Sequence, residues 1–134
     1  MSYKQTLYSE FIGGLETAIN SLHGCQVVSI ISKGNIFPIA EMRHISYDLS
    51  DETMGKEQQY IEFGYEINIY AVDTETLLAD EIVEDIEEVV IDYFNGVGFS
   101  YSTPSVRNSD ETVARRLVRV SAVYDENKNI VYRG

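Results

Sequence analysis

Residues 73–96, DTETLLADEIVEDIEEVVIDYFNG, decide the fold of this chain. Asp73 can cap the first turn of a helix, and Gly96 stands where helices commonly end in a left-handed residue. Between them, apolar residues recur at spacings of three and four, which places them on one stripe: Leu78, Ile82, Ile86, Val89, Val90 and Tyr93. The stretch therefore predicts an amphipathic helix whose stripe packs on a sheet built by the rest of the chain.

The polar residues of this predicted helix are mostly acidic, and no Lys or Arg within the helix answers them. They are Glu75, Asp80, Glu81, Glu84, Asp85, Glu87, Glu88 and Asp92. Such a charge run is usually a solvated face. On a helical wheel, however, Leu77, Glu84 and Ile91 fall in one line opposite the core stripe. We therefore expect the two aliphatic side chains to point outward and to be covered by a neighbouring subunit.

Composition limits the function classes. The 134 residues carry 10 Lys and Arg against 22 Asp and Glu, a formal net charge of −12. Such a chain is repelled by phosphate backbones, which argues against a general surface for wrapping nucleic acid. The length suits one domain, residues 1–134, with a continuous core. The absence of a signal pattern and of a long apolar run predicts a soluble protein with no membrane partner.

The only cysteine, Cys25, cannot form an intramolecular disulfide, which favours an intracellular assembly environment. His23 lies two residues away and makes the pair an obvious test for nucleophilic chemistry. A lone Cys that enters a strand is nevertheless most often a small buried hydrophobe. We expect no catalytic residue, no metal ligand and no cofactor.

Before the central helix, the sequence predicts one helix and three strands. Helical spacing indicates a helix over 3–22, with Gly13 and Gly14 at its middle, where we expect a kink or close packing. Strands are predicted over 25–32 and 37–49, and the acidic segment 48–59 is interpreted as a mobile loop or arm. The clearest strand covers 60–71, where apolar residues alternate toward the core: Ile61, Phe63, Tyr65, Ile67, Ile69 and Ala71.

After the central helix, three further strands are predicted. Pro104 restricts the first, over 99–106, to an edge or a bulge. The second covers 113–124 and places Arg115 and Arg119 on the face opposite Val118, and the last covers 130–132. The order α-β-β-β-α-β-β-β predicts an α+β fold, with a mainly antiparallel sheet of about six strands and two packed helices.

The basic residues of this half of the chain are concentrated in its strands: Arg107, Arg115, Arg116, Arg119 and Arg133. One acidic and one basic zone allow copies of the chain to pair head to tail around a ring. The alternative is pairing within the chain, with Glu62 or Glu66 on a neighbouring strand. Sequence alone leaves both open.

These elements together resemble the tail terminator (tail completion) proteins of long-tailed bacteriophages and phage-like elements. Four features carry the likeness over nearly the whole chain: the N-terminal helix before a β-branched strand, FPIA at 37–40, YEINIYA at 65–71 running into the helix, and RLVRVSAVYD at 116–125 with IVYR at 130–133. The resemblance implies a hexameric ring on the head-proximal end of the tail tube. Such a ring stops tube polymerisation and joins the tube to the head connector or stopper protein. DNA passes through it without specific binding.

On this hypothesis the protein acts in the tail-neck region of the virion and is assembled in the host cytoplasm. We place the subunit interface at Leu77, Glu84, Ile91, Arg115 and Arg119. We place the loop that docks onto the tube or a neighbour at Asp48, Asp51, Glu52, Met54 and Lys56. We place the acidic surface or lumen at Asp80, Glu81, Glu87 and Glu88.

Two alternatives stay open. One is another neck protein, a head-tail connector or stopper. The other is a small cytoplasmic ligand-binding or enzymatic α+β domain with a pocket between the sheet and the helices. An enzyme should place a His, Asp or Arg among core positions, and only Arg116, on the strand face of Val118 and Val120, suggests this.

Overall fold

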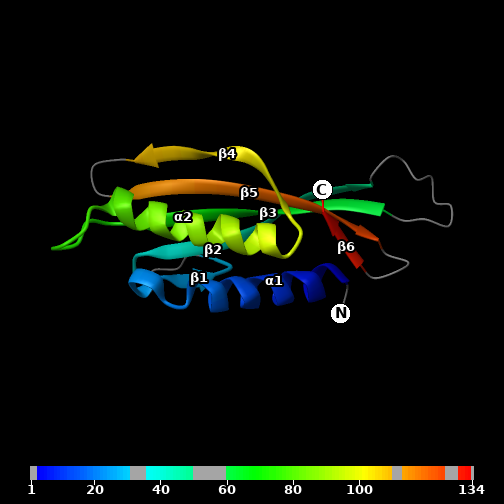
Figure 1. The fold of residues 1–134 in the computed structure, drawn as a ribbon, viewed down its shortest axis with the longest axis horizontal. Coiled ribbons are helices and arrows are strands. Elements are labelled where there is room, and N and C mark those ends of the chain that lie inside the picture. The colour runs from blue at the N-terminus through cyan, green and yellow to red at the C-terminus, as the bar shows by residue number, and fades with distance from the viewer. Residues whose placement is uncertain (1–2, 31–35, 50–59, 110–112, 126–129, 134) are drawn as a thin grey trace.

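The computed structural model describes residues 3–30, 36–49, 60–109, 113–125 and 130–133 (Figure 1). Two helices, α1 (Tyr3–Ile19) and α2 (Ala79–Gly96), pack on a sheet, and a 3₁₀ turn, η1 (Leu22–Gly24), follows α1. The strands are β1 (Gln26–Val28), β2 (Ile39–Leu49), β3 (Tyr60–Ala71), β4 (Ser100–Ser109), β5 (Ala114–Asp125) and β6 (Ile130–Arg133). The predicted α+β class is confirmed.

The sheet has the strand order β1-β2-β3-β5-β4, with β6 paired to the end of β5. Its body is formed by the four long strands β2, β3, β5 and β4, which pair antiparallel. The three-residue β1 runs parallel to β2, so the sheet is mixed. The prediction of about six antiparallel strands therefore overstates this sheet, because in the described part of the chain β1 and β6 are only short flanking pieces.

Of the predicted strand over 25–32, only Gln26–Val28 forms a strand among the described residues, and residues 31 and 32 lie outside them. Another group occupies the neighbouring position on the edge of β2. The parallel ladder ends where Val28 pairs with Glu41. At the next residue of β2, the hydroxyl of Tyr8 on α1 donates a hydrogen bond to the Met42 carbonyl. A side chain of α1 thus occupies an edge position that a longer strand would need.

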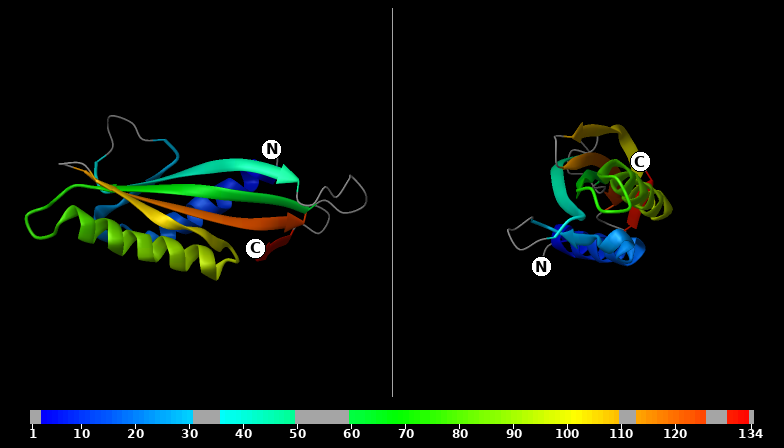
Figure 2. Two further views of the ribbon diagram at one scale, coloured as in Figure 1. Left: turned by 90° about the horizontal axis from the view of Figure 1, so that it is seen from above. Right: turned by 90° about the vertical axis from the view of Figure 1, so that its left-hand side faces the viewer.

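Both helices cover the same face of the sheet, and the sheet curves around α2 (Figure 2). The predicted alternation of β3 is confirmed, since the buried side chains are Phe63, Tyr65, Ile67, Ile69 and Ala71. Phe99 joins the layers, because its ring centroid lies 4.9 Å from that of Phe11 on α1 and 5.0 Å from that of Phe94 on α2. Edge-to-face packing of this kind suits aromatic cores.

Helix α2 begins at Ala79 and not at Asp73, and its buried stripe is Ala79, Ile82, Val83, Ile86, Glu87, Val90 and Phe94. Leu78, predicted to be core, is 59% exposed. The late start has a local cause, because the Thr74 hydroxyl accepts a hydrogen bond from the Leu77 amide and holds a turn there. Asp73 still serves the helix end, since its Oδ1 accepts the Ala79 N–H at 2.7 Å.

The close packing expected at the paired glycines of α1 is confirmed at one of them. A Cβ at Gly14 would overlap the Tyr93 hydroxyl oxygen of α2, whereas a Cβ at Gly13 meets no atom within 4 Å. The missing side chain at Gly14 thus lets the two helices approach each other. None of the described helices is both long and apolar enough to cross a membrane.

Candidate functional site

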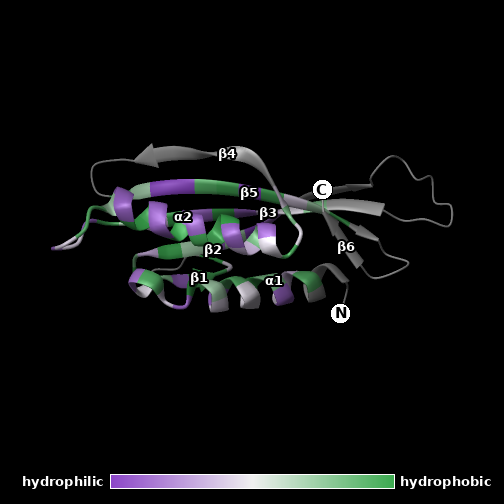
Figure 3. Ribbon diagram, viewed as in Figure 1, coloured by the Kyte–Doolittle hydropathy of each residue, from purple (hydrophilic) through white to green (hydrophobic). Residues whose placement is uncertain are grey.

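The outward face of α2 is acidic, as predicted, and the helix shows hydrophilic segments between its hydrophobic ones (Figure 3). The exposed carboxylates are Asp80, Glu81, Glu84, Asp85, Glu88 and Asp92. We call these residues the acidic face. Asp85 contacts the His23 ring at 2.8 Å, and Glu84 lies 3.6 Å from the Arg116 guanidinium. Basic side chains therefore lie next to Glu84 and Asp85, at the centre of the acidic face.

Glu87, which we predicted to lie on the acidic surface, is instead buried at 8% exposure. Its Oε1 accepts a hydrogen bond from Nη1 of Arg116, which reaches across from β5 and is 9% exposed. Within the described residues, Arg116 Nε has no hydrogen-bond partner. The prediction was wrong for Glu87 because the shifted helix phase turns this residue toward the sheet. The core position of Arg116, which had suggested an enzyme, is explained by this ion pair.

The expectation that Leu77 and Ile91 point outward is also wrong. Leu77 lies before α2, and both side chains are half-buried and pack against the hydrophobic core. The late start of the helix removes Leu77 from the helical wheel, and Ile91 lies beside the buried stripe, partly covered by the core against which it packs. The geometric reason for placing these two residues at a subunit interface is therefore lost, whereas Glu84 remains exposed.

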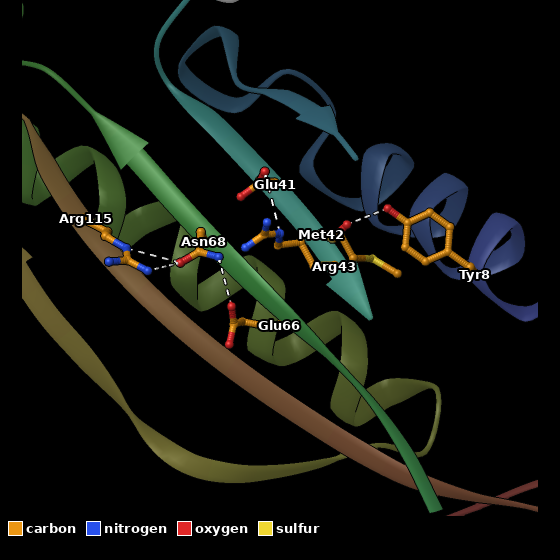
Figure 4. A network of polar contacts seen from close by, with 7 residues as sticks. All are labelled: Tyr8, Glu41, Met42, Arg43, Glu66, Asn68 and Arg115. Carbon is orange, nitrogen blue, oxygen red and sulfur yellow. Dashed lines mark hydrogen bonds and ion pairs between the residues drawn. The ribbon is translucent and has the colours of Figure 1, made fainter. Parts of the chain in front are cut away.

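The face of the sheet that the helices leave uncovered carries polar side chains (Figure 4). Arg119 Nε donates to Glu66 Oε2 at 3.2 Å, which is the pairing within the chain that sequence left open. Arg43 on β2 lies opposite Glu66 and approaches Glu41 at 3.9 Å. We call this uncovered surface the arginine face, defined by Arg43, Arg115 and Arg119.

Arg115 is positioned by an amide. Its Nε and Nη2 donate to Asn68 Oδ1 at 3.1 and 2.6 Å, and its guanidinium lies 5.8 Å from the centroid of the Tyr70 ring. Asn68 is 1% exposed, and its Nδ2 donates to Glu66 Oε1 at 3.4 Å. Sequence analysis missed Asn68 because alternation placed it on the solvent side. The available signal was that Asn is uncommon in strands and stands here between Ile67 and Ile69.

Cys25 does not form a nucleophile and base pair with His23. Burial raises the pKa of the Cys25 thiol to about 12, so the thiol stays protonated near neutral pH. Its Sγ faces the Gln26 carbonyl at 3.6 Å, and the exposed His23 is bound to Asp85. A cavity of about 340 Å³ adjoins Cys25 and is lined by Glu16, Ser21, Cys25, Gln26, Val27 and Val28.

The predicted docking loop lies mostly outside the described residues, and this holds for Asp51, Glu52, Met54 and Lys56. The backbone of Asp48 belongs to β2, where it pairs with Glu62 beyond a bulge, while its side chain is outside the described part. Among the residues that the structure describes, no group of three His, Cys, Asp or Glu side chains is arranged to hold a metal ion.

Comparisons with known proteins assign no family to this chain. No protein-family model matches the sequence, and a search of curated proteins finds no match. The interpretation of the acidic and arginine faces therefore depends on their own chemistry.

Proposed function

We propose that this chain is a structural assembly protein, a phage tail terminator that forms a ring, most simply a hexamer, on the tail tube. The observation that carries the proposal is the placement of the acidic and arginine faces on opposite sides of one domain. The register puts Arg115 and Arg119 on the face away from α2, whose outer side bears the carboxylates. Opposite charges on opposite faces favour head-to-tail contacts between copies, and such contacts close into a ring when the rotation closes.

The overall charge supports the same role. With a net charge of −12, a ring of this chain repels the phosphates of DNA that pass through its lumen. Tail tube protein on one side and a head connector or stopper protein on the other are the partners that this role requires. The segment 48–59 stays our candidate for the arm that docks onto the tube or a neighbour.

The enzymatic alternative has less support. Arg116, the residue that suggested it, contacts Glu87 and Glu84 and so has a structural reason to be buried. Cys25 beside the cavity is held as a neutral thiol. The other alternative, a connector or stopper protein, shares the assembly class and differs in which partner it binds.

The test is the mass of the protein in solution, measured by light scattering across protein concentration and salt, with and without assembled tail tubes of the same phage. We expect either a ring of six in solution or a monomer that assembles into such a ring when tail tubes are added. The contacts between subunits should weaken as salt screens the charged faces. Binding to the head connector but not to tubes would favour the connector or stopper alternative. A monomer under all these conditions would contradict the proposal and direct attention to ligand screening.

A further inference from the structure

Arg115 differs from the other two arginines of β5. Arg116 contacts the carboxylate of Glu87, and Arg119 contacts that of Glu66. Within the described part of the chain, Arg115 contacts an amide oxygen and an aromatic ring and no carboxylate. Its positive charge therefore has no anionic partner there, although the chain as a whole has a large excess of acids.

The Arg115 side chain is also held in place. Asn68 accepts two of its N–H groups, and Asn68 is itself buried and bound to Glu66 (Figure 4). A guanidinium has five N–H donors in a planar fork, so donors remain for a further acceptor. Because these contacts already order the half-buried Arg115 side chain, it loses little further conformational freedom when a ligand binds. The planar fork matches a carboxylate, which it can bind with two parallel hydrogen bonds.

We infer that Arg115 is a docking residue for a carboxylate on the acidic face of a second copy of this chain, an inference that rests on the proposed ring. The acidic face of the same chain is out of reach, because the sheet lies between Arg115 and α2 (Figure 4). A phosphate of DNA is a poorer occupant, because a net charge of −12 repels it.

Two carboxylates of α2 are the best partners. Glu81 and Glu88 are exposed, lie two turns apart on one side of the helix, and form no ion pair with any described residue. Glu84 and Asp85, between them, already contact Arg116 and His23. A neighbour's Arg115 would therefore meet, at Glu81 or Glu88, a carboxylate that no described residue of its own chain pairs with.

The experiment compares two charge reversals on the arginine face, Arg115→Glu and Arg43→Glu, by light scattering at several protein concentrations. Both change the net charge equally, and Arg43 already lies near Glu41. We expect Arg115→Glu to raise the concentration for half-assembly by about tenfold or more, as the loss of a docked charge pair does, and Arg43→Glu to change it by less than about threefold. Equal effects would overturn the inference, because assembly would then respond to net charge alone.

A charge swap provides the second test. Glu81→Arg or Glu88→Arg, combined with Arg115→Glu, should restore assembly to within about threefold of wild type. Each of the two glutamates is exposed, so the single variants also test the contact if Arg115→Glu fails to fold. Failure of both swaps, with each variant folded by circular dichroism, would overturn the inference.

The outcomes separate this inference from the function on which it rests. If wild type forms rings and Arg115→Glu forms them equally well, the ring stands and the docking role is wrong. If wild type never assembles, both are wrong. If Arg115→Glu leaves ring mass unchanged but lowers retention of double-stranded DNA, the occupant is a phosphate and the second-copy contact is overturned.

Discussion

The ion pair between α2 and β5 makes a stability prediction that does not depend on function. Glu87 is 8% exposed and Arg116 is 9% exposed, so the carboxylate and guanidinium meet almost entirely out of water. Glu87→Ala removes the carboxylate and leaves the guanidinium buried. The other acidic neighbour of the Arg116 guanidinium is Glu84, which lies 3.6 Å away and has a side chain that is 66% exposed. We expect this variant to be strongly destabilised.

Removing one partner of a buried ion pair typically destabilises a protein by about 3–5 kcal/mol. The contact with Glu84 remains in Glu87→Ala, so we expect the lower end, about 3 kcal/mol. For a domain of this size that lowers the melting temperature by about 10 °C. The double variant Glu87→Leu with Arg116→Met removes both charges and fills the space. Its free energy of unfolding should lie within about 1 kcal/mol of the wild-type value or above it.

The assay is urea unfolding followed by far-UV circular dichroism and by tyrosine emission, because the chain has ten Tyr and no Trp. Glu88→Ala is the matched control: it removes the adjacent, exposed carboxylate and should change the unfolding free energy by less than about 0.5 kcal/mol. If Glu87→Ala is no more destabilising than Glu88→Ala, the ion pair contributes nothing and our account of Arg116 is wrong.

The further predictions concern the two glycines of α1 and Cys25, which lies just before β1. Gly13→Ala should raise the unfolding free energy by about 1 kcal/mol, since its Cβ meets no atom and alanine favours helix. Gly14→Ala should lower it by about 1 kcal/mol, because its Cβ displaces Tyr93; equal effects in urea unfolding would contradict the close contact. The raised pKa of Cys25 implies that the unfolded thiol ionises above about pH 9 while the folded one stays neutral. Stability then falls by about 1.4 kcal/mol per pH unit toward pH 12, and the decline should be shallower in Cys25→Ala.

Periodicity predicted the long elements correctly because their patterns are local. Side chains alternate across a strand whatever packs on it, so residues 60–71 were assigned to the right strand and the right face. The acidic run of α2 likewise marked a solvated helix face. The paired glycines of α1 predicted a kink or close packing, and close packing occurs at Gly14.

Patterns failed where two local tendencies competed or where a distant group intervened. The helical pattern extended to Asp73, but the turn closed by Thr74 delays the helix to Ala79. The β-branched run after Cys25 favoured a long strand, but the ladder ends at the pair Val28 and Glu41, and the Tyr8 hydroxyl binds the next carbonyl of β2. Neither result could be read from propensity, because each depends on which of the competing hydrogen bonds is present in the folded structure.

By itself, then, the sequence determined the class of the fold, its two helices and long strands, the core face of β3 and the excess of negative charge. Tertiary structure decided which polar residues are partners. It buried Glu87 against Arg116 from another element, and it placed Asn68 under Arg115 across two strands. The physical reason is that the periodicity of a helix or strand sets only the direction in which a side chain points. Its burial and its charge partner are set by whatever element, far away in the chain, packs in that direction.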